Sequence, residues 1–276
     1  MISLGAANFD EVKIITRPVS TNIFMLAGAG GNIAISVGED GIFMIDAQFA
    51  PLAERIETSM QKIHAGPIRF LVNTHWHGDH TGGNEFFGSK VPILAHENVR
   101  ARLMSMQKRG DRKIEPAPKQ AWPILTYTES ITLHFNDEDI LVKHFANGHT
   151  DGDSMVFFKK ANVLHMGDHF FNGKFPFIDS NSGGHLDGYL KNVHQVIREA
   201  KEDIKIIPGH GPLANLDDLK LFVHMIETTR QIIKEYQQKG MSRKEILKAG
   251  LPEIWSSWGD GFISTKKWIE TLLGES

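Results

Sequence analysis

The 276-residue chain contains no cysteine, which excludes disulfide bonds, thiolate nucleophiles and cysteine-ligated zinc. It also lacks the apolar run of roughly 20 residues that a membrane-spanning helix needs. Its first residues have no basic stretch followed by an apolar one, so we expect no signal peptide in the chain as given. The expected compartment is therefore the cytoplasm, or the periplasm if a leader has been removed.

An excess of basic residues is also missing, because 30 Lys and Arg stand against 33 Asp and Glu, for a formal net charge of -3. This balance argues against nucleic acid or a membrane surface as the main partner. Apolar residues make up 41% of the chain and charged residues 23%, as in an ordinary globular domain. The composition leaves the oligomeric state open.

Short apolar runs rich in Ile, Val and Phe predict strands, at 12–16, 22–27, 32–37, 41–47, 69–74, 91–96, four places between 131 and 168, and 204–208. Apolar residues at helical spacing, or helix-capping patterns, predict helices, at 51–64, 97–109, 186–201, 215–239, from 242 onward, and 262–273. The strands form two blocks, each followed by helices. We predict one domain over 1–276, with sheets inside, helices outside and a helical extension over about 215–276.

Charged residues and three prolines between 110 and 123 predict a surface loop. The glycine-rich stretch GAGGN (28–32) lies between two predicted strands and indicates a hairpin turn. This turn is either a mobile flap over a nearby site or a simple exposed turn.

Histidine is plentiful, with 14 residues, and four metal-binding side chains follow one predicted strand directly in HWHGDH: His75, His77, Asp79 and His80. Imidazole and carboxylate groups are good zinc ligands, and these four exceed what one tetrahedral ion requires once other ligands join. In an extended segment His75 and His77 point the same way, and Gly78 allows the chain to turn. The segment predicts two adjacent metal sites.

Three later residues are candidates for the remaining ligands. His149 lies in NGHTDGD, Asp168 ends VLHMGD, and His210 lies in PGHG, each where a strand gives way to a glycine-containing turn. Strand ends can hold such groups at one edge of a sheet. A single histidine is more commonly a surface or core residue. A buried cluster of three His and an Asp would be costly to desolvate without a metal, so the cluster favours the metal interpretation.

HWHGDH, GHT, GDH and PGHG, in this order, resemble the metallo-β-lactamase superfamily of zinc hydrolases over about residues 20–215. The resemblance implies an α+β fold, a four-layer αββα sandwich with two Zn²⁺ at one edge of its sheets. It implies a first zinc site of His75, His77 and His149, and a second of Asp79, His80 and His210. Asp168 matches the carboxylate that bridges both metals in glyoxalase II-like thioesterases and lactonases.

The resemblance also gives Asp46, in FMIDA, the role of an aspartate that orients the ligand-bearing loop. Iron or manganese are alternatives to zinc where an aspartate bridges. One departure is clear. Lactamases with a cysteine ligand have it where Asp168 stands, and three residues later a Lys that holds the substrate carboxylate. Phe171 stands at that position, which argues against efficient β-lactam hydrolysis.

For the reaction, the resemblance implies a metal-bound hydroxide that attacks a carbonyl group, since zinc lowers the pKa of bound water to about 7. Asp79 is the expected catalytic residue, orienting the hydroxide or relaying a proton. The resemblance implies a small-molecule substrate. Two zinc ions, two aspartates and hydroxide leave a net charge of about +1, so we expect the site to favour a substrate that carries a carboxylate.

Candidate substrate contacts are residues close to the ligands in sequence: Trp76, Phe170, Lys174, Asn181 and His185. Trp76 is equally suited to packing under the metal loop. Of Phe170 and Phe171, one is expected to flank the pocket and the other to pack inside. His169 is expected to point away from Asp168.

The predicted function is hydrolysis of amide, ester or lactone bonds. A glyoxalase II-like thioesterase is the alternative, although the chain lacks a convincing basic C-terminal region for glutathione. A phosphodiesterase or nuclease would share the ligands, but the balanced charge opposes it. Flavodiiron reductases carry Glu where His77 stands, and a flavin domain, so we set them aside. A metal-binding protein without catalysis is the remaining alternative.

Overall fold

Two sheets form the centre of the structure, a computed structural model that describes residues 9–109 and 112–274. The first sheet has seven strands, in the order β1 (Ile15–Pro18), β2 (Ile23–Ala27), β3 (Ile33–Gly38), β4 (Gly41–Ile45), β5 (Ile68–Val72), β6 (Ile93–His96) and β9 (Leu125–Tyr127). The second has five, β10 (Ser130–Phe135), β11 (Glu138–His144), β12 (Ser154–Phe158), β13 (Val163–His165) and β14 (Lys205–Ile207).

In each sheet the strands on one side pair antiparallel, and those on the other side pair in parallel. Strands β1 to β4 pair antiparallel, whereas β5, β6 and β9 extend the sheet in parallel. In the second sheet only β13 and β14 pair in parallel. Parallel neighbours end at the same edge, so the loops that follow them come together there.

Eight α-helices accompany the sheets in the described ranges: α1 (Ala53–Ile63), α2 (Gly78–Thr81), α3 (Asn84–Gly88), α4 (Glu97–Leu103), α5 (Leu186–Glu199), α6 (Leu216–Gln238), α7 (Arg243–Ala249) and α8 (Thr265–Leu273). Short 3-10 helices lie at Phe9–Glu11, Ala50–Leu52, Lys119–Ala121, Gly167–His169, Ser180–Ser182 and Glu253–Asp260. None of the helices in 9–109 and 112–274 is both long and apolar enough for a membrane crossing.

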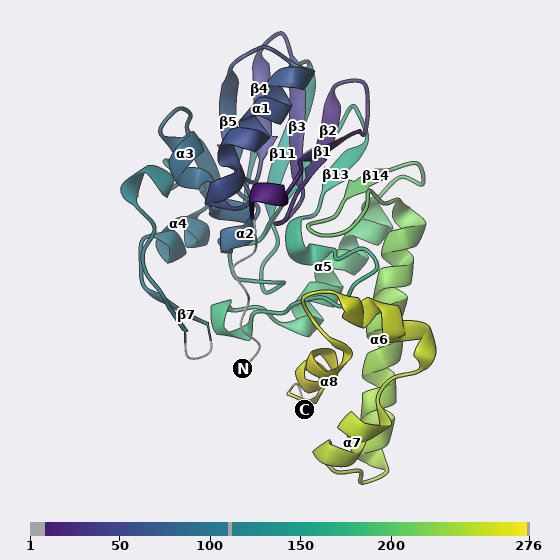
Figure 1. Ribbon diagram of the computed structural model, residues 1–276. Coiled ribbons are helices and arrows are strands. Elements are labelled where there is room, and N and C mark those ends of the chain that lie inside the picture. The colour runs from purple at the N-terminus through teal and green to yellow at the C-terminus, as the bar shows by residue number, and fades with distance from the viewer. Residues whose placement is uncertain (1–8, 110–111, 275–276) are drawn as a thin grey trace.

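The apolar side chains sort into layers. Phe43 of β4 meets Phe135 and Phe158 of the second sheet, with ring centroids 6.1 and 6.3 Å apart, in the core between the sheets. Helix α1 buries the helically spaced Ile56 and Met60 against the outer face of the first sheet. Helices α5 and α6 cover the second sheet in the same way. The predicted αββα sandwich is therefore confirmed (Figure 1).

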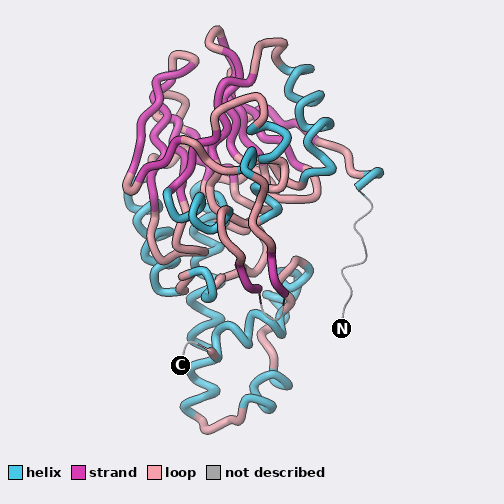
Figure 2. The backbone as a smooth tube through the Cα atoms, turned by 90° about the vertical axis from the view of Figure 1, so that its left-hand side faces the viewer, coloured by secondary structure: helices cyan, strands magenta, loops and turns pink. Residues whose placement is uncertain are grey.

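The C-terminal helices extend beyond one end of the sheets (Figures 1 and 2). Helix α6 begins with a capping box, in which the Asn215 side chain accepts from the backbone of Asp218 and the Asp218 side chain accepts from the backbone of Asn215. Helix α8 is anchored by Trp268, a fully buried residue whose indole N–H donates to Thr229 Oγ1 at 2.9 Å. The extension is thus packed onto the rest of the chain.

The prediction of a helix over 97–109 is wrong beyond Leu103. The side chain of Gln107 donates to the carbonyls of Arg102 and Ser105, which satisfies backbone groups at the helix end. The chain then forms the antiparallel strands β7 (Gln107–Arg109) and β8 (Arg112–Ile114). The predicted loop 110–123 therefore contains a strand and a 3-10 turn, while its residues 110 and 111 lie outside the described part. Helices α2 and α3 and strand β9 were not predicted.

Candidate metal centre

The predicted ligands all emerge from strand ends at one edge of the sandwich. The HWHGDH segment follows β5, Asp168 follows β13 and His210 follows β14, while His149 lies in the turn from β11 to β12. Because β13 and β14 are parallel, Asp168 and His210 come from the same edge. One turn of helix, α2, carries Asp79 and His80.

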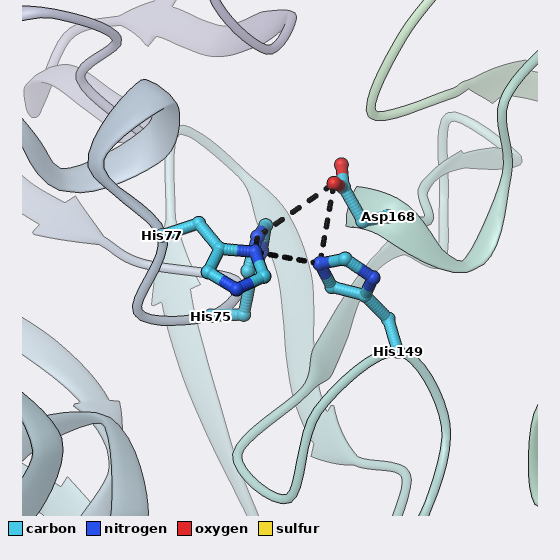
Figure 3. A group of neighbouring side chains, drawn as sticks. All are labelled: His75, His77, His149 and Asp168. Atoms are coloured by element: carbon cyan, nitrogen blue, oxygen red, sulfur yellow. Dashed lines mark hydrogen bonds and ion pairs between the residues drawn. The ribbon is translucent and has the colours of Figure 1, made fainter. Parts of the chain in front are cut away.

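Four of these side chains form the first cluster, shown in Figure 3. His77 Nδ1 lies 2.8 Å from His149 Nε2 and 3.1 Å from His75 Nε2. Asp168 Oδ2 lies 3.4 Å from His149 Nε2 and 3.7 Å from His75 Nε2. All four side chains are buried, so three nitrogens and one oxygen face a common point with little solvent.

The second cluster consists of Asp79, His80 and His210. His210 Nε2 lies 3.3 Å from Asp79 Oδ2 and 3.4 Å from His80 Nε2. The other oxygen of Asp168, Oδ1, lies 3.0 Å from His80 Nε2 and 3.4 Å from His210 Nε2. The structure therefore brings together all seven predicted ligands, with one oxygen of Asp168 facing each cluster.

His77 and His149 each have one ring nitrogen inside the cluster and one outside it. The hydrogen bond at the outside nitrogen determines which of the two carries the proton. His149 Nδ1 donates to the Phe177 carbonyl at 2.7 Å, and His77 Nε2 donates to Asp179 Oδ2 at 2.9 Å. Both partners only accept, so the protons sit on these outer nitrogens. The inner nitrogens of His77 and His149, 2.8 Å apart, then present two lone pairs to each other. That arrangement is repulsive unless a cation lies between them, so the donor set fits a metal.

Asp46 supports ligands of both clusters. Its Oδ2 accepts from His80 Nδ1 at 2.7 Å and from Thr74 Oγ1 at 2.7 Å, and its Oδ1 accepts from the Thr74 backbone at 2.8 Å. Thr74 Oγ1 in turn accepts from His75 Nδ1 at 3.1 Å. Asp46 adopts a left-handed φ of 62°, an unusual conformation that an aspartate tolerates better than most residues. The structure thus places Asp46 where it orients the ligand loop.

Burial and neighbouring charges shift the pKa values of the histidines in opposite directions in the two clusters. Burial lowers the pKa of His149 to about 4 and that of His75 well below its usual value, so both rings are neutral. For His210, burial is outweighed by Asp168 and Asp79, which raise its pKa to about 9. The histidines that surround Asp168 outweigh its burial and hold its pKa well below the ordinary value. The carboxylates at the second cluster therefore attract positive charge.

One buried atom is separate evidence that the second cluster suits a cation. Asp168 Oδ1 is buried and accepts no hydrogen bond of acceptable geometry from any described residue. Such atoms are rare in folded proteins and are commonly explained by an ion. Because Oδ1 faces His80 and His210, a metal ion held by these residues would satisfy it. The residues present fit a metal at both clusters.

The structure places the candidate substrate contacts in different surroundings. Trp76 is buried with Ala95, Val99 and Leu103, under the metal loop. Lys174 lies along Gly261 of the C-terminal extension, with its amine 3.5 Å from the Ser257 carbonyl.

Two further candidates lie on the exposed loop before α5. Asn181 is exposed. His185 is exposed and caps α5, its Nδ1 accepting from the Asp187 backbone at 3.2 Å. In the structure His185 thus has a helix-capping role.

The prediction of substrate contact is wrong for Phe170. Its side chain is fully buried, and its ring lies 5.1 Å from Phe222 of α6, in the core outside the second sheet. Its neighbour Phe171 faces the site instead, stacked on His210 with ring centroids 5.1 Å apart and an angle of 11°. His169 points away from Asp168, as expected, and bonds Asn192 through Nε2 at 3.1 Å.

The turn at 28–32 is docked on the second cluster. The Gly31 amide donates to the Asp79 carbonyl at 3.0 Å, and Gln48 Nε2 donates to the Gly31 carbonyl at 2.7 Å. Asn32 Nδ2 donates to the carbonyls of Pro208 and Gly211, each at 2.9 Å. This half of the turn is a fixed wall of the site, so the expectation of a free flap is wrong for residues 31–32.

Sequence reasoning missed Asp179. This buried carboxylate orients His77 and also accepts from Ser182 Oγ at 2.8 Å. It lies 102 positions from His77, in an irregular loop whose composition gives no sign of a ligand partner. Only the folded structure reveals the pair.

An αββα sandwich with two His/Asp clusters at its edge is the architecture of a metal-dependent hydrolase. The model of the metallo-beta-lactamase superfamily matches residues 17–210 of the chain. The chain belongs to this superfamily and is a metallo-hydrolase of it. It is similar to "Metallo-beta-lactamase type 2" of Bacteroides fragilis, with 23% identity over 193 residues, 69% of this chain and 68% of the relative.

Two other comparisons agree. The chain is 27% identical over 152 residues to "Probable metallo-hydrolase YqgX" of Bacillus subtilis, covering 53% of this chain and 69% of the relative. The crystal structure of DIM-1 metallo-beta-lactamase superposes with a TM-score of 0.63 at 22% identity, covering 79% of this chain and all of that one. At this identity the structural match shows a shared fold.

Proposed function

We propose that this protein uses two zinc ions to hydrolyse an amide, ester or lactone bond in a small molecule. The observation that carries the proposal is the position of Asp168, which offers Oδ2 to the first cluster and Oδ1 to the second. A carboxylate shared in this way suits a pair of cations, and iron or manganese would also accept these ligands.

In this proposal each cation has three ligands of its own, besides the shared Asp168. His75, His77 and His149 hold the first, and Asp79, His80 and His210 hold the second. When bound, zinc ions supply Lewis acidity, which lowers the pKa of water and polarises a carbonyl group. Asp79 and His210 are each 28% exposed, whereas the other ligands are at most 5% exposed.

That difference sets the direction of approach. Substrate reaches the site past Asp79 and His210, because these two are the most exposed of the seven residues. Asp79 then lies on the side from which substrate approaches, where its ionised carboxylate can accept a hydrogen bond from a water molecule and orient it. Two divalent ions with Asp79 and Asp168 leave a charge of +2, which favours a carboxylate on the substrate.

A thioesterase of the glyoxalase II kind is the second candidate, favoured by the same bridging position of Asp168. Phe171 stands where a lactamase would have a lysine for the carboxylate of a β-lactam. It carries no charge, and its ring stacks on His210. We therefore rank esters, lactones and thioesters above β-lactams as substrates.

The test is metal analysis combined with a panel of esters, lactones, thioesters and nitrocefin. We expect two zinc ions per chain, turnover of at least one ester-type substrate, and faster turnover when that substrate carries a carboxylate. His149→Ala should remove the turnover. Two bound metals without hydrolysis of any panel member would instead favour a metal-binding protein without catalysis.

A further inference from the structure

The segment from 171 to 179 forms one side of the metal centre. Phe171 stacks on His210, the Phe177 carbonyl accepts from His149, and Asp179 accepts from His77. Three ligands therefore depend on this one segment for their orientation. The residues that pack against this segment are therefore close to the metal centre.

The C-terminal extension is what packs there. The Phe175 amide donates to the Trp258 carbonyl at 3.0 Å, and the Phe175 ring stacks on Trp268 with centroids 5.6 Å apart. Phe175 and Trp268 are both fully buried, so this contact is part of the core. The extension is thereby held at a defined position beside the metal centre.

From this position the extension presents an aromatic side chain next to the site. The ring of Phe177 lies 5.8 Å from His77 and 5.7 Å from His149. The ring of Phe262 lies 5.8 Å from the ring of Phe177, at an angle of 81°. A continuous series of rings therefore leads from two ligands of the first cation to the C-terminal extension.

Phe262 is 58% exposed, and its ring contacts Phe177, which adjoins two residues of the first cluster. The Lys267 amine lies 5.1 Å from its ring centroid, which helps to hold the ring in place. The ring of Phe262 is therefore within reach of a ligand that binds beside Phe177. An aromatic ligand group also gains from edge-to-face or offset contact with such rings.

We propose that Phe177 and Phe262 form an aromatic wall that receives an apolar, preferably aromatic, group of the substrate beside the carbonyl bound at the cations. This inference rests on the proposed function and narrows its substrate class. It makes the C-terminal extension, beyond the part that matches the superfamily, a determinant of specificity.

Binding of two thiols to the cobalt-loaded protein tests this without any catalytic turnover. Propane-1-thiol and 3-phenylpropane-1-thiol share a metal-binding group and differ by one ring, and thiolate binding to cobalt gives an absorption band that can be titrated. Thiols cannot reduce disulfides in this chain, because it has no cysteine. We expect the phenyl compound to bind more tightly, and Phe262→Ala to weaken it about 2- to 10-fold while propane-1-thiol is unchanged.

Matched variants separate the ring from a general loss of apolar surface. Phe262→Tyr should restore the preference. Ile254→Ala, on the same extension, removes another exposed apolar side chain (73% exposed) and should leave both thiols unchanged. Equal binding of the phenyl compound by the wild type and Phe262→Ala would overturn the aromatic wall alone. Absence of a cobalt band with either thiol would overturn the proposed metal centre, and the wall with it.

Discussion

Asp46 Oδ2 accepts a hydrogen bond from His80 Nδ1 at 2.7 Å, deep in the protein where both side chains are fully buried. The same oxygen accepts from Thr74, which in turn accepts from His75. One carboxylate thus orients one ligand of each cluster, although it faces neither cation itself. Such partners commonly determine metal affinity almost as strongly as the ligands do.

Asp46→Asn should therefore weaken metal binding about 10- to 100-fold, most strongly at the second cluster. Asparagine tolerates the left-handed backbone, but its amide NH₂ cannot accept from His80. Competition with a chromogenic chelator gives the affinities. Asp139→Asn, which alters an exposed His–Asp pair at the same 2.7 Å, is the control. Unchanged affinity in Asp46→Asn would contradict the role assigned to Asp46.

Asp179→Ala should lower the affinity of the first cluster by about 10-fold or more, because His77 Nε2 then loses its acceptor and the ring can flip or change tautomer. Zinc content after dialysis against a weak chelator measures the effect. Asp179→Asn keeps one acceptor oxygen and should lie between the wild type and Asp179→Ala. If all three proteins retain two zinc ions equally, Asp179 does not position His77.

The residues of the two clusters could be picked out from sequence because each lies in a short local motif that follows a strand. Asp179 could not, since its partner His77 lies 102 positions away and the loop around it has no periodicity. Phe170 and Phe171 show a different difficulty. Alternation along the chain predicts that one of the two rings packs in the core and the other faces the site. The 3-10 turn at Gly167–His169, with Gly167 at a φ of 51°, determines which ring takes which position.

Helix α4 shows the same limit on a larger scale. The polar residues up to Arg109 suit a helix as well as a loop, and propensity alone does not locate the end. The end is determined by side-chain bonds of Gln107 to backbone carbonyls and by pairing with β8. Such contacts depend on the folded geometry. By contrast, the helices α1, α5 and α6 were predicted to within two residues at each end.

Gly31→Ala should destabilise the protein by about 1–3 kcal/mol and disturb the second cluster, because overpacking displaces neighbours. An added Cβ would lie 2.1 Å from Cε1 of His80, which is itself held by Asp46. Thermal unfolding and zinc content measure both effects. Gly78→Ala is the matched control in the ligand segment, since its Cβ would meet no described atom within 4 Å. Equal loss in both variants would show that Gly31 has no special role.

The stacked pair His96 and His144, with centroids 3.8 Å apart, should make the protein less stable in acid. His96 Nε2 donates to the Thr128 carbonyl and His144 Nδ1 to the Asp153 carbonyl. Burial lowers the pKa of both rings, and for His144 the neighbouring His96 lowers it further, which outweighs nearby acidic groups.

The sign of the effect follows from proton uptake. As pH falls through about 6.5, the unfolded chain binds protons on these histidines before the folded chain does, so the free energy of unfolding decreases. About one pH unit or more above 6.5, neither state binds these protons and the pair no longer affects the slope. Melting in EDTA between pH 7.5 and 5 should therefore show a shallower loss of stability for His144→Gln than for the wild type. The exposed His194→Gln serves as the control. Parallel profiles for wild type and His144→Gln would contradict the prediction, because a difference of up to about 1.4 kcal/mol per pH unit is expected for each proton excluded by folding.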